Sequence, residues 1–393
     1  MTNPRLRGYE GPALFSYGFR PFFLGGALYS ALAIMLWLPM YMDGLVLPSA
    51  FPPLAWHVHE MLFGFLPAIV TGFLLTAVPN WTGRTPLRGA PLAALAGLWL
   101  AGRAAIAFSD VIGAIPAAVI DCSFLASVTL AVTWEIAKGR NWRNLKVAGL
   151  IALLLAGNIL FHIELAARGS FAAAERVGIA AIILIIVLIG GRVVPAFTRN
   201  WLMQHNPGRL PAAFDRTDAA IVALTVLAFA VWAGAGASPS VAALFALAGI
   251  AHAWRLARWA GWRAARDPMV LILHLGYAFV PLGFAFMAAA MWLGHAALLS
   301  AGLHIWTAGA AGTMTLAIMT RASLGHTGRP LRAGRATAGI YAAVIAAALA
   351  RAIAPLFPEA TVLWLHAAAF LWLAAFGGFA LVYGPMLLRP RAA

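Results

Sequence analysis

The stretch WHVHEMLFGFLPAIVTGFLLTAVPNWTGR (Trp56–Arg84) decides the fold class. It opens with His57, His59 and Glu60, continues through a long apolar run, and ends in polar residues before Arg84. About 20 apolar residues are enough to cross the hydrocarbon core of a bilayer as a helix. The stretch therefore predicts a membrane-spanning helix that carries ionisable side chains near one end.

The composition extends this prediction to the whole chain. Of the 393 residues, 63% are hydrophobic and only 10% are charged, and the mean hydropathy is +0.88. Soluble proteins carry about 25% charged residues, so we predict a polytopic membrane protein embedded in the lipid bilayer. The net charge of +15 does not indicate nucleic-acid binding, because the basic residues lie in short connections between apolar runs.

About twelve apolar runs predict an all-α polytopic membrane helix bundle of about twelve transmembrane helices. No soluble domain interrupts them, so we predict a single integral membrane domain over residues 1–393. The first run is too long for the apolar part of a signal peptide, and we expect an uncleaved anchor. The runs lie near residues 22–42, 55–78, 90–108, 112–134, 146–166, 177–198, 218–235, 238–258, 268–292, 296–320, 337–357 and 361–388.

The basic residues orient this bundle. They gather in the N-terminal segment (Arg5, Arg7), in every second connection and in the C-terminal tail, whereas the opposite connections hold only Arg168 and Arg176. Connections rich in lysine and arginine face the cytoplasm. We therefore expect both termini to be cytoplasmic, and the first helix to run outward across a bacterial inner membrane.

A second stretch, HIWTAGAAGTMTLAIMTRASLGHTGR (His304–Arg329), aligns with the first without a gap. An even number of crossings separates the second and tenth predicted helices, so the repeat would be parallel and would relate helices 2–3 to helices 10–11. A chance match between helices rich in alanine and leucine is the alternative. The aligned positions are His59 with His304, Gly64 with Gly309, and Thr82-Gly83-Arg84 with Thr327-Gly328-Arg329.

The single cysteine, Cys122, limits the cofactors that the chain can hold. One cysteine excludes an internal disulfide, a zinc ribbon, a cysteine-ligated iron–sulfur cluster and a CxxCH haem attachment. Any haem would therefore be bound non-covalently, as haem b.

The histidines are the main candidates for chemistry. An ionisable residue inside a bilayer is a functional candidate, and imidazole binds copper, zinc and iron, including haem iron. A histidine at a helix end can instead simply bond a backbone group or a lipid headgroup. The predicted topology gathers five histidines from four helices toward the outer side: His57, His59, His162, His304 and His366.

The repeat suggests one haem site among these histidines. His59 and His304 would lie at similar depth, and we predict that they ligate a haem b between the second and tenth helices. His57 points about 200° around an ideal helix from His59, so the two do not readily chelate one ion. Arg103 and Arg351 could bind the haem propionates, or they could extend to the outer interface.

Three acidic residues fall within the apolar runs: Glu60, Asp121 and Glu164. A carboxylate there can orient a ligating histidine, move protons to a reaction, or simply pair with an intramembrane arginine. Asn158 and His162 are four residues apart and share a helix face. We take the three acids as candidates for a proton path.

Several blocks occur in the order found in one family. They are SYGFRPFFLGG (Ser16–Gly26), WHVHEMLFGF (Trp56–Phe65), LLTAVPNWTGR (Leu74–Arg84), GGRVVPAFTRNWL (Gly190–Leu202), AHAWRLARW (Ala251–Trp259), LHLGYAFVPLG (Leu273–Gly283) and GTMTLAIMTRASLGHTGRPL (Gly312–Leu331). Over nearly its whole length, the chain resembles the NnrS family of bacterial membrane proteins. The resemblance implies twelve helices, haem and copper as cofactors, and a link to denitrification and nitrosative stress.

The resemblance also implies metal ligands within these blocks. Its histidines are His57, His59, His252, His274, His304 and His326, and His162 joins them from the outer group. The resemblance does not assign haem or copper to individual histidines, and a second site near the cytoplasm, at His252, His274 and His326, is an alternative.

The resulting hypothesis is a haem and copper membrane protein that binds nitric oxide and reduces or detoxifies it. Its electron donor is not identified by the sequence. A secondary transporter for a metal or haem is one alternative, since twelve helices with repeats fit it. A non-catalytic nitric oxide sensor or scaffold is another.

Overall fold

The computed structural model describes residues 9–391, and every regular element within this range is a helix. Arg5 and Arg7 of the charge pattern lie outside the described residues. The elements used below are α1 (Phe19–Tyr41), α2 (Pro53–His59), η3 (Glu60–Phe65), α3 (Leu66–Thr82), α4 (Ala90–Ala107), α5 (Ser109–Ile112), α6 (Ala114–Lys138), α7 (Leu145–Arg168), α8 (Ala172–Ile185), η5 (Ile186–Gly190), α9 (Gly191–His205), α10 (Arg216–Ala235), α11 (Pro239–Ala257), η6 (Gly261–Ala264), α12 (Pro268–Leu293), α13 (Ala296–His304), η7 (Ile305–Gly312), α14 (Thr313–His326), α15 (Arg335–Ile353) and α16 (Thr361–Leu388).

The predicted membrane helix bundle is confirmed. Each of the twelve predicted runs lies on a helix, and within residues 9–391 eleven helices are long and apolar enough to cross a membrane. The run predicted at 296–320 is the continuous helix formed by α13, η7 and α14. The second and sixth helices are longer than predicted, at Pro53–Thr82 and Ala172–His205, because their polar ends continue the helix beyond the apolar run.

Three of these long helices contain a π-helical segment: η3, η5 and η7. Such segments insert an extra residue into the helical ladder and are frequent at functional sites. Segment η3 begins directly after His59, and η7 begins directly after His304, the residue that aligns with it. The two aligned helices therefore share a local distortion as well as a sequence pattern.

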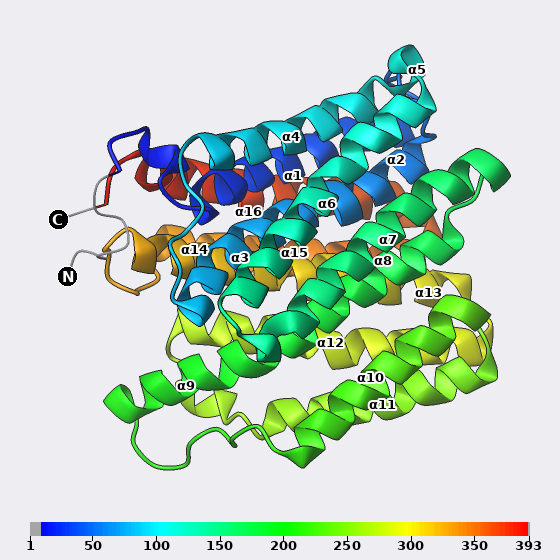
Figure 1. Cartoon of the computed structure of the whole chain (residues 1–393). Helices are drawn as coiled ribbons and strands as arrows, with labels where there is room; N and C mark the ends of the chain where they lie inside the picture. The colour runs from blue at the N-terminus through cyan, green and yellow to red at the C-terminus, as the bar shows by residue number, and fades with distance from the viewer. Residues whose placement is uncertain (1–8, 392–393) are drawn as a thin grey trace. The chain divides into compact units, whose positions relative to one another are not determined.

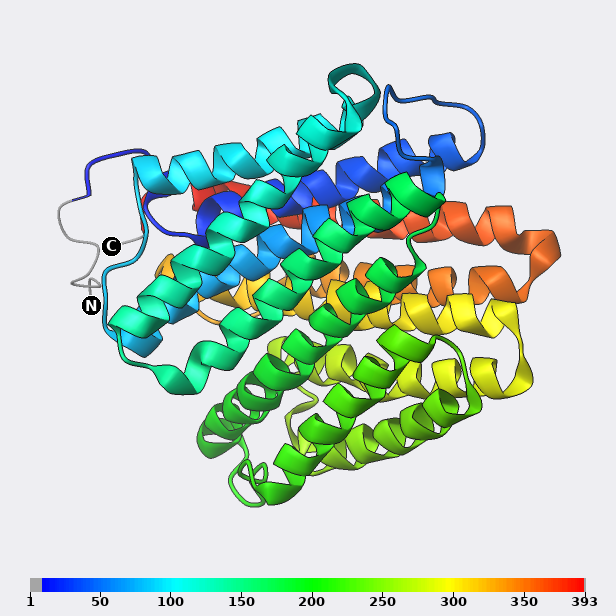
Figure 2. The ribbon, with the colours of Figure 1, turned by 45° about the vertical axis from the view of Figure 1, so that its right-hand side comes forward.

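The described chain forms two compact units. The first runs to Ala181 and takes in Ile318–Leu331 and the chain from Phe376 onward. Within it, α1 packs on α3, α4 packs on α6, and α6 packs on α7, so that α4, α6 and α7 lie side by side (Figures 1 and 2). These packed faces bring residues of α2, η3, α4, α6 and α7 together inside the first unit.

The second unit comprises Ile182–Ala317 and Arg332–Ala375. Helix α12 packs on α11 and α13, and α10 packs on α11. Aromatic rings fill the space between them, with Trp306 lying 4.8 Å from Phe284 and 5.5 Å from Phe245 between ring centroids. Phe229 and Trp232 of α10 complete this cluster. The aromatic core fixes α10, α11 and α12 against one another.

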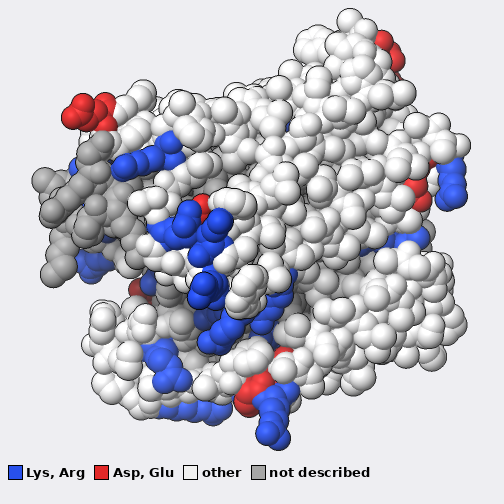
Figure 3. Space-filling model, in the orientation of Figure 1, with Lys and Arg blue, Asp and Glu red and all other residues white. Residues whose placement is uncertain are grey.

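The surfaces of these helices suit a lipid environment. In Figure 3 the surface over the middle of α4, α6 and α7 carries no charge, and basic side chains gather near the connection between α6 and α7. Large apolar side chains on that surface are exposed, including Leu130 at 70% and Leu100 at 57%. Extended apolar surface of this kind marks contact with a membrane rather than with water. The chain is a multi-pass membrane protein.

Candidate metal centre

The π-helical segment η3 organises a buried polar site in the first unit. Glu60 and Gly64 lie in it, and His59 directly precedes it. An interrupted helical ladder leaves a carbonyl to be bonded elsewhere, and here the indole of Trp99 on α4 donates to Gly64 O at 2.9 Å. This bond holds the distorted turn against α4, where Arg103 lies one helical turn further along.

Arg103 joins the two acidic residues of the site. Its Nη1 lies 2.5 Å from Glu60 Oε1, and its Nη2 donates to Asp121 Oδ1 on α6. Gly64 makes room for this pair, since a Cβ at that position would lie 2.5 Å from Arg103 Nη1 and 3.0 Å from Glu60 Oε2. All the charged groups are buried, and buried charges persist only when they are paired and hydrogen-bonded.

His59 lies between the same two carboxylates. Its Nδ1 is 2.8 Å from Glu60 Oε1, and its Nε2 is 3.0 Å from Asn158 Oδ1 and 3.2 Å from Asp121 Oδ2. The amide of Asn158 donates to Asp121 Oδ2 at 2.8 Å, which leaves its oxygen facing His59. Both ring nitrogens of His59 therefore face acceptors, and both carry a hydrogen when these bonds form. The ring is then an imidazolium.

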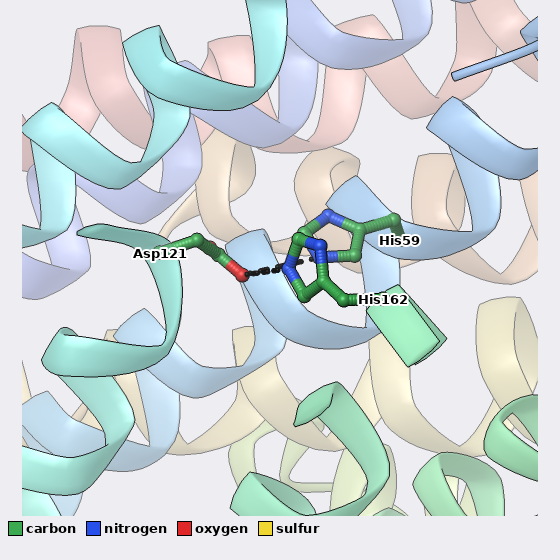
Figure 4. Close-up of side chains that lie close together, drawn as sticks. All are labelled: His59, Asp121 and His162. Carbon is green, nitrogen blue, oxygen red and sulfur yellow. Dashed lines mark hydrogen bonds and ion pairs between the residues drawn. The ribbon is translucent and has the colours of Figure 1, made fainter. Parts of the chain in front are cut away.

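His162 completes the group from α7. Its Nε2 donates to Asp121 Oδ2 at 3.0 Å, so that both histidines converge on one carboxylate (Figure 4). One ligand atom from each of His59, Asp121 and His162 lies within 4.8 Å of the others, a spacing that could hold a metal ion. His59 and Asp121 are fully buried, and the side chain of His162 is 10% exposed.

The charges of this site balance. The carboxylates of Glu60 and Asp121 give two negative charges, and the guanidinium of Arg103 gives one positive charge. The imidazolium of His59 supplies the second, so the buried group is neutral. Without that proton the group carries one net negative charge, which either a proton or a monovalent cation can neutralise. Neutrality matters here because an uncompensated buried charge is costly.

A small ion fits this group better than a haem does. Copper binds imidazole ligands, and it would replace the proton on His59 Nε2. A haem needs space beside the ring as well as an open nitrogen, and the rings of Phe51, Phe63 and Phe161 enclose His59 at centroid distances of 5.2–5.6 Å. Haem ligation by His59 stays a prediction, and it would break at least one of the hydrogen bonds of that histidine.

Other predicted residues of the first unit lie outside this group. His57 stacks on Trp37 at 4.1 Å between ring centroids. Glu164 accepts hydrogen bonds from the backbone N–H groups of Ala173 and Ala174, at 3.0 and 2.9 Å, and so caps the start of α8. His326 packs on the ring of Tyr17 at 5.4 Å. Their proposed roles as ligands or proton carriers remain predictions.

Four predicted residues belong to the second unit. His304 donates from Nδ1 to Ser300 O at 2.8 Å, and Arg351 lies in the last turn of α15. The cytoplasmic candidates are separately bonded, His252 to Thr225 and Tyr277, and His274 to Thr198. Pairing of His59 with His304 therefore stays a prediction.

The second unit also contains a buried polar cluster that the sequence analysis did not identify. Arg255 donates from Nε to Asp218 Oδ1 at 2.7 Å, and from Nη1 to Tyr277 Oη at 3.0 Å and to the η5 carbonyl of Val187 at 3.2 Å. Tyr277 is 2.9 Å from His252 Nδ1. The sequence signal that could have revealed this cluster is a pair of opposite charges at the ends of two apolar runs: Asp218 in the first turn of α10 and Arg255 in the last turn of α11.

Tyr29 is the member of the first site that the sequence did not reveal. Tyr29 lies on α1, and its hydroxyl donates a hydrogen bond to Glu60 Oε2. A tyrosine in an apolar helix is usually part of the packing, and no spacing in the sequence joins α1 to η3. Only the packing of α1 on that segment brings the two together.

The comparisons with known proteins agree with the resemblance of the motifs. The NnrS family, described as NnrS protein, matches residues 13–391. No functionally curated protein matches the sequence. Because the family match covers nearly every described residue, this chain belongs to the NnrS family.

Proposed function

We propose that the protein binds nitric oxide in a bacterial inner membrane and reduces it, with copper and haem b as cofactors. The observation that carries this proposal is the buried group of His59, Asp121 and His162, with ligand atoms within 4.8 Å, in a chain of the NnrS family. The resemblance described above links that family to nitric oxide.

Copper in its monovalent state suits the charge of this group. Asp121 and the two imidazoles would hold the ion, and Glu60 and Arg103 would keep Asp121 and His59 in place. Bound copper would supply a site for electron transfer or for a nitric oxide molecule. A divalent ion would leave one uncompensated positive charge, which disfavours it in a buried site.

The protein's own residues would supply protons. Converting two nitric oxide molecules into N₂O and water consumes two electrons and two protons. With copper in place of the Nε2 proton, His59 keeps a proton on Nδ1 beside Glu60, to which Tyr29 also donates. Nitric oxide, a small apolar gas, would enter through the lipid rather than through water.

Haem b would have to bind through a histidine other than His59 and His162, the two that would hold copper. His304, which directly precedes the π-helical segment η7, is the candidate that the repeat favours, with Arg351 on the adjacent α15 as a partner for propionates. A haem that binds nitric oxide without turning it over would make the protein a sensor instead of an enzyme.

Optical spectra of the detergent-purified protein test this proposal, together with iron and copper analysis. The proposal predicts b-type haem bands in the reduced protein that shift on addition of nitric oxide, and bound copper. Turnover would then be measured as nitric oxide consumption under reducing conditions. A protein that contains neither iron nor copper after expression with both supplied would contradict the proposal and leave the transporter alternative.

A further inference from the structure

An apolar groove of about 1180 Å³ runs along the second unit between α11 and α12. Trp262, between the two helices in the chain, lies at one end of the groove, and Trp292 near the end of α12 lies at the other. Both indoles are exposed, at 58% and 73%. Tryptophans at this spacing mark the two membrane interfaces, so the groove crosses the bilayer and is open to lipid.

Small side chains make the groove. Gly249 brings α11 close to α12, since a Cβ there would lie 3.3 Å from Pro281 O. Alanines spaced three, four or seven residues apart, which leave the groove hollow, continue the wall on each helix. The small residues of the wall are Ala246, Gly249 and Ala253 on α11, and Ala278, Ala285 and Ala289 on α12.

Between the two tryptophans at its ends, the described lining of this groove holds one polar side chain, that of His274. It is 93% buried, with a relative exposure of 7%. The hydroxyl of Thr198 donates to Val194 O at 2.8 Å, so its oxygen accepts from His274 Nε2, also at 2.8 Å. This bond fixes the hydrogen on Nε2. It leaves a lone pair on Nδ1, which has no hydrogen-bond partner among residues 9–391.

The groove therefore suits a ligand that donates one hydrogen bond and is otherwise apolar. His274 lies six residues after Pro268, about 9 Å along α12, and Trp292 lies about 27 Å further. A ligand with a neutral hydroxyl head and a long hydrocarbon tail matches this spacing. Phosphate headgroups offer acceptors to a lone pair, and a hydrocarbon chain alone offers nothing to it.

We propose that the groove between α11 and α12 binds an isoprenoid quinol, with a ring hydroxyl donating to His274 Nδ1 and the tail lying along the alanines. A quinol combines an aromatic hydroxyl with a long apolar chain. The backbone of Gly261 packs against the imidazole ring, and a larger residue would cover the nitrogen, since a Cβ there would lie 2.3 Å from Nδ1.

The binding of quinol stands by itself, and its redox role rests on the proposed function. A quinol becomes a quinone when its two O–H bonds break, releasing two electrons and two protons. Two nitric oxide molecules take up these electrons and protons to give N₂O and water, so atoms and charge balance. The groove would then supply the electron donor that the proposed function requires.

Photolabelling with an azido-quinone held in its reduced quinol form, so that the probe keeps its hydroxyls, tests the binding directly in the full-length purified protein when it is competed by decylubiquinol. We expect adducts on peptides of α11 and α12, and competition by decylubiquinol. His274→Leu removes the lone pair, so the concentration of decylubiquinol needed to block labelling should rise about five- to tenfold. His274→Gln keeps an acceptor and should leave that concentration unchanged. Ala278→Phe, one turn along the groove from His274, should abolish labelling.

Two matched controls separate this effect from a folding defect. Ala230→Phe on α10 adds the same bulk to an exposed position outside the groove, and His366→Leu removes an imidazole from α16, where it bonds only Val362 O in the described structure. Both should leave labelling unchanged. Adducts that map elsewhere, competition by phospholipid instead of decylubiquinol, or equal labelling of Ala278→Phe would overturn the proposal. None of these readouts needs metal or nitric oxide turnover.

Discussion

Arg103 Nη1 lies 2.5 Å from Glu60 Oε1, and this ion pair joins α4 to the π-helical segment that follows His59. The same guanidinium also pairs with Asp121. One arginine thus neutralises one carboxylate completely and leaves the remaining negative charge for His59 or for a metal ion.

Removing this arginine should destabilise the protein strongly. Arg103→Met leaves Glu60 and Asp121 buried with too little positive charge, which costs about 3–5 kcal/mol. The measurement is the thermal unfolding of the detergent-purified protein. Arg84→Met is the matched control, because the Arg84–Glu135 pair is 43% and 34% exposed and such pairs contribute about 0–1 kcal/mol. Equal melting temperatures for the two variants would show that Arg103 is not needed for neutrality.

Gly64→Ala should displace the same ion pair without removing a charge. The new Cβ would lie 2.5 Å from Arg103 Nη1, and overpacking of this kind costs about 1–3 kcal/mol. Gly97→Ala, also in a helix of the first unit, meets nothing within 4 Å, so the better helix propensity of alanine should make it neutral or stabilising. The comparison is again made by thermal unfolding. An unchanged melting temperature in Gly64→Ala would mean that the Arg103–Glu60 ion pair can shift to admit the added methyl group without loss of stability.

Thr225→Val tests the polar cluster of the second unit. Thr225 Oγ1 donates to Ile221 O at 2.7 Å and accepts from His252 Nε2 at 2.9 Å. The substitution leaves a buried N–H without a partner, which costs about 1–3 kcal/mol. Thr129→Val, whose hydroxyl donates to Leu125 O in its own helix, should change the melting temperature much less. If Thr225→Val and Thr129→Val change the melting temperature equally, the hydrogen bond from His252 to Thr225 contributes nothing to stability.

The fold followed from the sequence to a greater extent than the site did. The lengths of the apolar runs and the basic connections predicted twelve helices. The thickness of the bilayer sets the length of a spanning helix, and basic residues gather in the connections on its cytoplasmic side. His59, Asp121 and His162 were each identified, but not as one group, since their α2, α6 and α7 positions share no sequence period. The packing of α6 on α7 brings them together. Alignment of His59 with His304 drew attention to a pair instead of to this trio.

Asp215, which lies just before α10, should make the stability of the folded protein depend on pH. It caps α10, accepting from Asp218 N at 3.0 Å, and it pairs with Arg258. The hydrogen bond from Arg258, followed by that from the Asp218 backbone, lowers the pKa of Asp215 to about 2. Because this pKa lies below that of an unfolded aspartate, about 3.9, the carboxylate contributes stability above pH of about 4 and loses it as the pH falls toward 2.

The melting temperature of Asp215→Asn, measured from pH 6 to pH 2, checks this dependence. The wild-type protein should melt above the variant at pH 6, and the gap should close as the pH falls toward 2. The effect should be small, because the Asp215 side chain is 47% exposed. A gap that does not change with pH would show that the charge of Asp215 contributes nothing.

Titration of the detergent-purified, metal-free protein with Cu(I), in competition with a colorimetric chelator, tests the central claim most directly. The wild-type protein should bind one tight equivalent, and both Asp121→Asn and His162→Leu should lose it. His205→Leu, which removes an exposed imidazole that bonds only within α9, should bind like the wild type. Tight binding that survives in both Asp121→Asn and His162→Leu, or no tight binding in the wild type, would contradict a metal centre at His59, Asp121 and His162.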